Sequence, residues 1–273
     1  RALRLAVISA CVIGVIRFGP GLVSLPASPT TGGQQVRVMS WNLAAGQVAA
    51  DLLVDRLLAA EADVVGLQEL RGEHATAIEA SRELAERFPN RVLEPHGTVL
   101  GMALLSRHAL IEHSSSEAPP FIAASLDLGP ASPPLTTITA HPLPARMALI
   151  GGLIPVQFDA SQRDAALHTI RHRVEPALND GQPVLLLGDF NVTDREPAYR
   201  DLTVGLSDAH LIAGFGPGST WRPPAADFLP FGVLRIDYIF AGGAARPLSV
   251  SVECVPAAGD HCIVSGVIEV VER

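Results

Sequence analysis

The spacing of apolar and polar residues predicts a domain that mixes strands with helices. Helical spacing of apolar residues predicts helices over 48–60, 75–88, 161–178 and 198–202. Short apolar or alternating runs predict strands over 36–43, 63–68, 101–106, 122–128, 135–140, 184–187, 235–240, 248–255 and 263–271. Ser161 is the expected N-cap of the third helix, and Pro176 lies near its end. This mixture, with no repeat at a fixed period, predicts a layered α/β domain.

The run VLLLGDFNVTD places an acid and an amide directly after a buried strand. Four apolar residues beginning at Val184 suit a strand that is buried on both faces, and Gly188 ends it. Asp189 and Asn191 have the same side-chain parity, so both project the same way if the chain stays extended.

The N-terminus carries an apolar segment, Leu5–Ile16, between Arg4 and Arg17. A run of about 10 to 14 apolar residues suits a membrane anchor, a cleaved signal or a buried core helix, and we favour the anchor. The chain begins with Arg, so one hypothesis is that upstream apolar residues complete a transmembrane helix. We therefore expect a hydrophobic N-terminal helix in 1–25, a linker in 26–35 and a catalytic domain in 36–273, held at the membrane with the domain outside the cytoplasm.

Composition narrows the possible partners. The chain has 273 residues, 20 basic residues that are all Arg, 28 acidic residues and a net charge of −8. Its mean hydropathy is +0.30. The Arg residues are scattered, so the basic track of a dedicated nucleic-acid binder is missing, although a bound cation can supply local positive charge.

Three cysteines leave two readings open. Cys254 and Cys262 flank a turn between two predicted strands, so they can form a disulfide in an exported domain or remain two free buried thiols. Zinc-binding Cys and His spacings are absent from the sequence.

Polar residues recur where the predicted strands end. Any one of them has an ordinary explanation, because loops are solvated, but the recurrence indicates a shared site along one sheet edge. Carboxylate and amide oxygens suit Mg²⁺ or Mn²⁺, and His with Asp suits activation of water. Together these groups point to phosphoester hydrolysis. The residues concerned are Asn42, Glu69, His141, Asp189, Asn191, Asp237, Asp260 and His261.

Six motifs in order resemble one known family, the endonuclease/exonuclease/phosphatase superfamily of deoxyribonuclease I-like proteins. They are VRVMSWNL, VVGLQEL, TAHPLP, LLLGDFNVTD, LRIDYIF and GDHCIV, spanning 36–271. The resemblance implies a four-layer α/β/β/α sandwich with its site at one edge of two packed sheets. With the apolar N-terminus, it suggests a membrane-associated, bacterial-type member.

The resemblance also implies roles for individual residues. Glu69, Asn42 and Asp260 would hold the metal. His261, oriented by Asp237, would lie next to the scissile phosphate, and Asp189 would orient or deprotonate the attacking water. The roles of base and orienter are exchangeable between His261 and Asp189. Hydrogen bonds to the phosphoryl oxygens would come from His141 and Asn191.

Two further positions bear on the resemblance. Gly259 stands where the family commonly has Ser, which removes a hydroxyl but no ligand, so we expect tuned rather than lost activity. Thr220 resembles a position near the substrate, although Thr is equally common at turns.

The substrate stays open at this stage. The segments 142–158 and 227–234 are unusually apolar, which suits packing within the domain or a rim that touches lipid. We favour an anchored phosphoester hydrolase acting on a phospholipid, a nucleic acid or a small phosphodiester. The alternatives are a secreted or surface endonuclease for DNA or RNA, outside the cytoplasm, and a non-catalytic binding domain. No obligate protein partner is expected.

Overall fold

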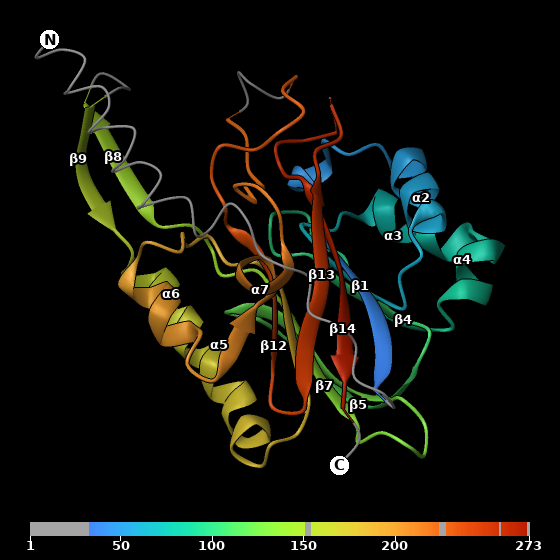
Figure 1. Cartoon of the computed structure of the whole chain (residues 1–273). Helices are drawn as coiled ribbons and strands as arrows, with labels where there is room; N and C mark the ends of the chain where they lie inside the picture. Colours follow the sequence, from blue (N-terminus) through green and yellow to red (C-terminus); the bar gives the residue numbers. More distant parts are fainter. Residues whose placement is uncertain (1–32, 151–153, 224–227, 257, 272–273) are drawn as a thin grey trace, which may run out of the picture.

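Two six-stranded mixed sheets lie face to face at the centre of the molecule (Figure 1). This computed structural model describes residues 33–150, 154–223, 228–256 and 258–271. The first sheet has the order β13-β14-β1-β2-β4-β3 and contains β1 (Gln34–Asn42), β2 (Val64–Gln68), β3 (Asn90–Glu94), β4 (Met102–Ser106), β13 (Ala245–Glu253) and β14 (Ile263–Val270). The second has the order β11-β12-β10-β7-β6-β5 and contains β5 (Ala109–Glu117), β6 (Pro120–Asp127), β7 (Leu135–Ala140), β10 (Val184–Asp189), β11 (Leu206–Asp208) and β12 (Asp237–Gly242).

Helices cover the outer face of each sheet. The first sheet is covered by α2 (Ala50–Ala59), α3 (Gly72–Ala80) and α4 (Arg82–Arg87), and the second by α5 (Ser161–Asn179) and α6 (Pro197–Leu202) (Figure 1). The short η2 (Ala44–Gly46) follows β1, and α7 (Ala209–Ala213) follows β11. The expected four-layer α/β/β/α sandwich is confirmed.

The buried strand β10 shows why the layers form. Leu185 and Leu187 point into the core between the two sheets, where they share a cluster with Val38 of β1. Leu186, on the opposite side, packs with Ile170 of α5. Both faces of this strand are therefore buried, as the uninterrupted apolar run predicts.

The predicted helix over 75–88 is wrong as a single element. It is two helices that meet at Ser81, whose ψ of 110° is extended and whose hydroxyl accepts a hydrogen bond from Leu84 N at 3.2 Å. A Ser side chain that bonds its own backbone competes with helix continuation, so the helix ends and restarts there.

The predicted cap of α5 is also wrong. Ala160 holds the N-cap position, and Ser161 is the first helical residue. The carboxylate of Asp159, one residue before the N-cap, accepts a hydrogen bond from Ser161 N at 3.0 Å. It therefore satisfies a backbone N–H at the start of the helix, as an N-cap side chain commonly does.

The segment after His141 is not a plain loop. It contains a hairpin of β8 (Arg146–Ile150) and β9 (Ile154–Asp159), which forms a separate two-stranded sheet and projects beyond the sandwich on the side of α5 and α6 (Figure 1). Met147 and Phe158 are directly paired across it, so their side chains share one face.

The N-terminal apolar segment and the linker up to residue 32 lie outside the described residues. Among the helices that are described, none has the length and apolar character that a membrane crossing needs.

Candidate active site

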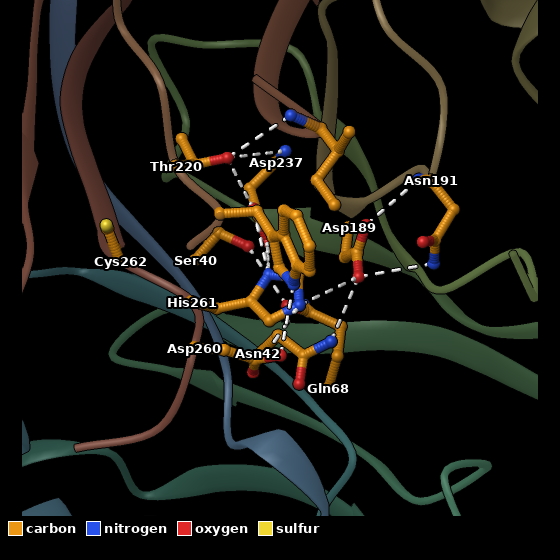
Figure 2. Close-up of polar contacts among 12 residues, drawn as sticks. Ser40, Asn42, Gln68, Asp189, Asn191, Thr220, Asp237, Asp260, His261 and Cys262 are labelled. Atoms are coloured by element: carbon orange, nitrogen blue, oxygen red, sulfur yellow. Dashed lines mark hydrogen bonds and ion pairs between the residues drawn. The ribbon is translucent and has the colours of Figure 1, made fainter. Parts of the chain in front are cut away.

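All eight predicted site residues lie at one edge of the two sheets, in one network of contacts. Figure 2 shows six of them, which are Asn42, Asp189, Asn191, Asp237, Asp260 and His261. The topology explains the convergence. The parallel pairs β1 with β2 and β7 with β10 end at this edge, whereas the antiparallel partners β12 and β14 begin there. Residues from distant parts of the sequence are thus brought together by strand direction.

Asn42 joins the two sheets at the centre of this network. Its Nδ2 atom donates to Glu69 Oε1 at 3.1 Å and to Asp189 Oδ2 at 3.0 Å. Its Oδ1 atom accepts from Ala44 N at 2.9 Å. Glu69 has a φ of 59°, which is uncommon for a residue other than glycine and marks a backbone held in place by its surroundings.

His141 is oriented by a backbone carbonyl. Its Nδ1 atom lies 3.0 Å from Val99 O, which can only accept, so Nδ1 carries a hydrogen. Nε2 faces Glu69 Oε1 and Asp189 Oδ2, each at 3.5 Å. Burial lowers the pKa of His141, but the hydrogen bond and charge of Asp189 and the charge of Glu69 outweigh it, and the pKa is raised. A second proton on Nε2 makes the ring a donor toward the cleft.

His261, Asp237 and Thr220 form a buried chain of hydrogen bonds (Figure 2). His261 Nδ1 lies 3.0 Å from Asp237 Oδ2, and Thr220 donates to the same oxygen at 2.6 Å. Burial opposes a charge on His261, but Asp237 and Asp189 outweigh it and raise the pKa to about 10. Burial and the charge of Asp189 raise the pKa of Asp237. Thr220 is 1% exposed, and its hydroxyl also accepts a hydrogen bond from Asp237 N at 3.1 Å, so it holds Asp237 in place.

Asp189 and Asn191 lie together through a turn, not through extended chain. Asn191 has a φ of 49°, and its backbone N donates to Asp189 Oδ1 at 2.9 Å. The side-chain amide donates to Pro142 O at 3.1 Å and to Asp189 Oδ2 at 3.3 Å. The chain is therefore not extended from Asp189 to Asn191, so the prediction that both side chains project the same way along a strand does not apply. The Asn191 amide can donate to a substrate oxygen only if it gives up one of these two hydrogen bonds.

Gly188 allows strand β10 to lie close to strand β7 just before this turn. Its φ is 140°, and a Cβ atom there would lie 2.0 Å from Ala140 O of the neighbouring strand β7. Only glycine fits at this position, so β10 can run close to β7 and bring Asp189 beside His141.

The carboxylate of Asp189 stays ionised despite its burial. Burial raises the pKa, but His261, His141 and the backbone N–H of Asn191 lower it further, and the resulting pKa lies below its usual value. Its Oδ2 atom is 3.7 Å from His261 Nε2. A buried carboxylate between two imidazoles is a group able to accept a hydrogen bond or a proton from water.

The sequence profile of the Endonuclease/Exonuclease/phosphatase family matches residues 39–261. The chain belongs to this family. No curated protein sequence is significantly similar to it.

Solved structures share the fold at low identity. TDP2 from D. rerio, complexed with a single-strand DNA product, is 16% identical over 86% of this chain and 99% of that chain, with a TM-score of 0.64. The endonuclease/exonuclease/phosphatase from Bacteroides vulgatus is 18% identical over 87% and 100%, with a TM-score of 0.63. A functionally unknown conserved protein from Enterococcus faecalis V583 is 16% identical over 87% and 100%, with a TM-score of 0.61. These likenesses establish the fold and leave the substrate of this family member open.

The site offers oxygen atoms that suit a hard cation. Glu69 and Asp260 keep 13% and 20% of their side chains exposed, whereas Asp189 is almost fully buried. Asn42 Oδ1, which accepts one backbone hydrogen bond, has a second lone pair. The expected set of Glu69, Asn42 and Asp260 therefore fits Mg²⁺ or Mn²⁺ by donor chemistry.

A second group of potential ligands lies deeper. Asp189, Asp237 and His261 offer ligand atoms within 4.8 Å of one another. His261 and Asp237 already satisfy each other at 3.0 Å, and this set includes an imidazole, which suits Mg²⁺ less than oxygen does. Of the two sets, the more exposed one therefore has the all-oxygen donors that Mg²⁺ prefers.

The loop that carries Asp260 and His261 is held by a disulfide. Cys254 and Cys262 form a disulfide, so the alternative of two free thiols is wrong. Trp221 Nε1 donates to Asp260 Oδ2 at 3.0 Å, which fixes that carboxylate. Trp221 carries no sequence signal beyond its place next to Thr220.

Gly259, the departure from the family pattern, has a conformational reason. Its φ is 81°, and a Cβ atom would lie 2.7 Å from Ala44 Cβ. A Ser at this position would be strained in this chain, so the glycine fits the local backbone.

The sequence also missed Arg163 of α5, which is 4% exposed. Its Nη2 atom pairs with Glu196 Oε2 at 2.6 Å, and Nη1 donates to Asn191 O at 3.0 Å. An Arg on a helix gives no local sign of such contacts, because both partners lie far along the chain.

A cleft of about 490 Å³ opens over the site. Glu69, His141, Asp189, Asn191 and His261 line its polar part. The β8–β9 hairpin and Leu234 line another part, so both apolar segments that the sequence analysis identified border this cleft.

Proposed function

We propose that this protein is a divalent-metal-dependent phosphoester hydrolase that acts on a phosphodiester. The observation that carries the proposal is the contact of Asp189 with both His141 and His261, at 3.5 and 3.7 Å, beside Glu69 at the wall of a cleft. An ionised carboxylate between two imidazoles, next to oxygen ligands, matches what in-line attack of water on phosphorus requires.

Glu69, Asn42 and Asp260 hold the cation in this proposal. When bound, Mg²⁺ or Mn²⁺ offsets charge on the phosphoryl oxygens and stabilises the leaving oxygen. Trp221 keeps Asp260 in place through its indole N–H.

The remaining residues position water and phosphate. Asp189 accepts a hydrogen bond from the attacking water, and His261 is held beside the scissile phosphate by Asp237. Base and orienter remain exchangeable between Asp189 and His261. His141 donates from Nε2 to a phosphoryl oxygen as negative charge builds, and Asn191 donates after exchanging one of its present acceptors.

A substrate panel tests this function. Purified protein with Mg²⁺ is assayed on bis-p-nitrophenyl phosphate, plasmid DNA, sphingomyelin and phosphoinositides. We expect turnover of at least one substrate, loss of that turnover with EDTA, and a fall of about 10² to 10⁴ in kcat for His261→Ala. The exposed His113 gives the control, since His113→Ala keeps the wild-type rate.

Two outcomes favour the alternatives. Turnover of plasmid DNA alone points to an endonuclease. No turnover of any substrate, together with no Mg²⁺ binding by calorimetry, points to a non-catalytic binding domain and rejects the proposal.

We further propose that the domain acts outside the cytoplasm, attached to the membrane by the apolar N-terminal segment. The disulfide supports an oxidising compartment, where such bonds persist. Protease treatment of intact cells tests the orientation: a domain that is protected from the protease contradicts it.

A further inference from the structure

One wall of the cleft is apolar and exposed. Met147 and Phe158 are 57% and 58% exposed, and both line the cleft from one face of the β8–β9 hairpin. Leu234, 44% exposed, lines it from the segment before β12. Large apolar side chains left in water beside a catalytic site mark a binding surface for an apolar group.

Apart from the imidazoles of His141 and His261 at the phosphate position, the cleft offers little free positive charge. Among the described residues that line it, Arg163 is the one Arg or Lys. That guanidinium already contacts the carboxylates of Glu196 and Asp164 and the carbonyl of Asn191. A polynucleotide gains most of its affinity from cations that neutralise successive phosphates, so this cleft suits a substrate with a single phosphate.

The apolar wall is attached to the catalytic loop. The guanidinium carbon of Arg163 lies 6.0 Å from the centre of the Phe158 ring, within the range of a cation–π contact. Because Arg163 also bonds Asn191, the base of the hairpin and the loop after β10 are held by the same side chain. Arg163 thereby links the apolar wall to the turn that carries Asn191.

We infer that an apolar subsite, formed by Pro144, Met147, Phe158 and Leu234, binds an alkyl ester arm of the substrate. The substrate carries a single phosphodiester group, and its phosphate lies against His141, Asp189 and His261. This inference rests on the proposed function and names its substrate class. The alkyl arm stays attached to phosphorus through its ester oxygen. The oxygen of water forms a new bond to phosphorus and displaces the other ester oxygen, which leaves with a proton as an alcohol or phenol.

Alkyl p-nitrophenyl phosphates with methyl, butyl and octyl arms test the subsite. Hydrolysis releases p-nitrophenol and leaves the alkyl phosphate, so the leaving group is constant while the arm changes. We expect kcat/KM to rise with arm length, by about two- to fourfold for each methylene that becomes buried. The double variant Met147→Gln/Phe158→Gln is expected to lose this rise with arm length.

Ile111 gives the matched control. It is 59% exposed on the edge strand β5 and does not line the cleft, so Ile111→Gln changes exposed apolar surface by a similar amount and leaves the rise intact. A flat dependence on arm length in the wild type, an unchanged rise in the double variant, or a higher kcat/KM for a single-stranded oligonucleotide than for the octyl ester overturns the inference.

A binding measurement separates failure of the subsite from failure of the proposed function. Calorimetry with Mg²⁺ compares octylphosphonate with methylphosphonate, neither of which is turned over. Tighter binding of the octyl compound by the wild type, but not by the double variant, supports the subsite. If no ester is hydrolysed in that case, only the proposed function is rejected. Equal binding of the two phosphonates rejects the subsite even if the methyl ester is hydrolysed.

Discussion

The Nη1 atom of Arg163 donates a hydrogen bond to the backbone carbonyl of Asn191 at 3.0 Å. Asn191 sits in a left-handed turn directly after the strand that carries Asp189, so this bond braces the turn from the covering helix. Helix α5, which covers the outer face of the sheet, therefore also positions a residue of the candidate site.

Replacement of Arg163 by Ala tests this brace. The change leaves Glu196 without its buried partner and is expected to lower the free energy of unfolding by about 2–4 kcal/mol. The freed Asn191 turn is expected to lower kcat about tenfold on any substrate that the protein turns over. Urea unfolding and steady-state kinetics measure the two effects.

Arg82→Ala is the control for Arg163→Ala. Arg82 also pairs with a Glu, at 2.8 Å, but its side chain is 90% exposed, so the loss is expected within about 0.5 kcal/mol. An Arg163→Ala variant as stable as this control contradicts the bracing role.

Glu69→Gln tests the cation assignment. The substitution removes a negative oxygen ligand but preserves side-chain size, so we expect Mg²⁺ affinity by calorimetry to fall more than about tenfold and turnover to be lost. Glu83→Gln, on the exposed surface of α4, keeps both. Unchanged Mg²⁺ affinity in Glu69→Gln shows that the cation is held elsewhere, with the trio of Asp189, Asp237 and His261 as the next candidate.

The stability of the metal-free protein is expected to depend on pH through His261. Its pKa is about 10 in the folded protein against an ordinary value of 6.5, because Asp237 and Asp189 outweigh the effect of burial. A raised pKa means that the folded state favours the charged ring. The resulting stabilisation is complete below about pH 6.5 and disappears as the pH rises toward 10.

Urea unfolding in EDTA between pH 6 and 10 checks this dependence. We expect the stability difference between the wild type and His261→Gln to shrink steadily as the pH rises. The ring resonances of His261 by NMR give the pKa directly, and a titration midpoint near 6.5 contradicts the strong coupling to Asp237.

Removal of the disulfide should loosen the loop that carries Asp260 and His261. The bond closes a short loop between Cys254 and Cys262, separated by eight positions, and its loss is expected to lower the free energy of unfolding by about 2–3 kcal/mol. The Cys254→Ser/Cys262→Ser variant measures this by urea unfolding. Dithiothreitol should reproduce the loss in the wild type and have no effect on the variant, and a wild type that is insensitive to dithiothreitol argues against the bond.

Local pattern was sufficient to predict the layered fold and much of the residue set at the sheet edge. The apolar run before Gly188 is buried on both faces, because the other sheet covers one face and helices cover the other. Polar residues that follow neighbouring strands of the same direction lie close together at one edge of the sheet. The break at Ser81 escaped prediction, because apolar spacing continues through it while the backbone conformation changes.

The sequence by itself determined which side chains of this protein stand at strand ends, since burial periodicity and residue chemistry are local properties. Only the tertiary structure decided how they act on one another. The contacts of Arg163 with Asn191 and of Trp221 with Asp260, the pairing of the two cysteines, and the apolar hairpin beside the cleft all join residues from different elements. Such contacts depend on how the sheets and helices pack together, because packing sets the distances and burial that govern hydrogen bonds, pKa values and access of a substrate.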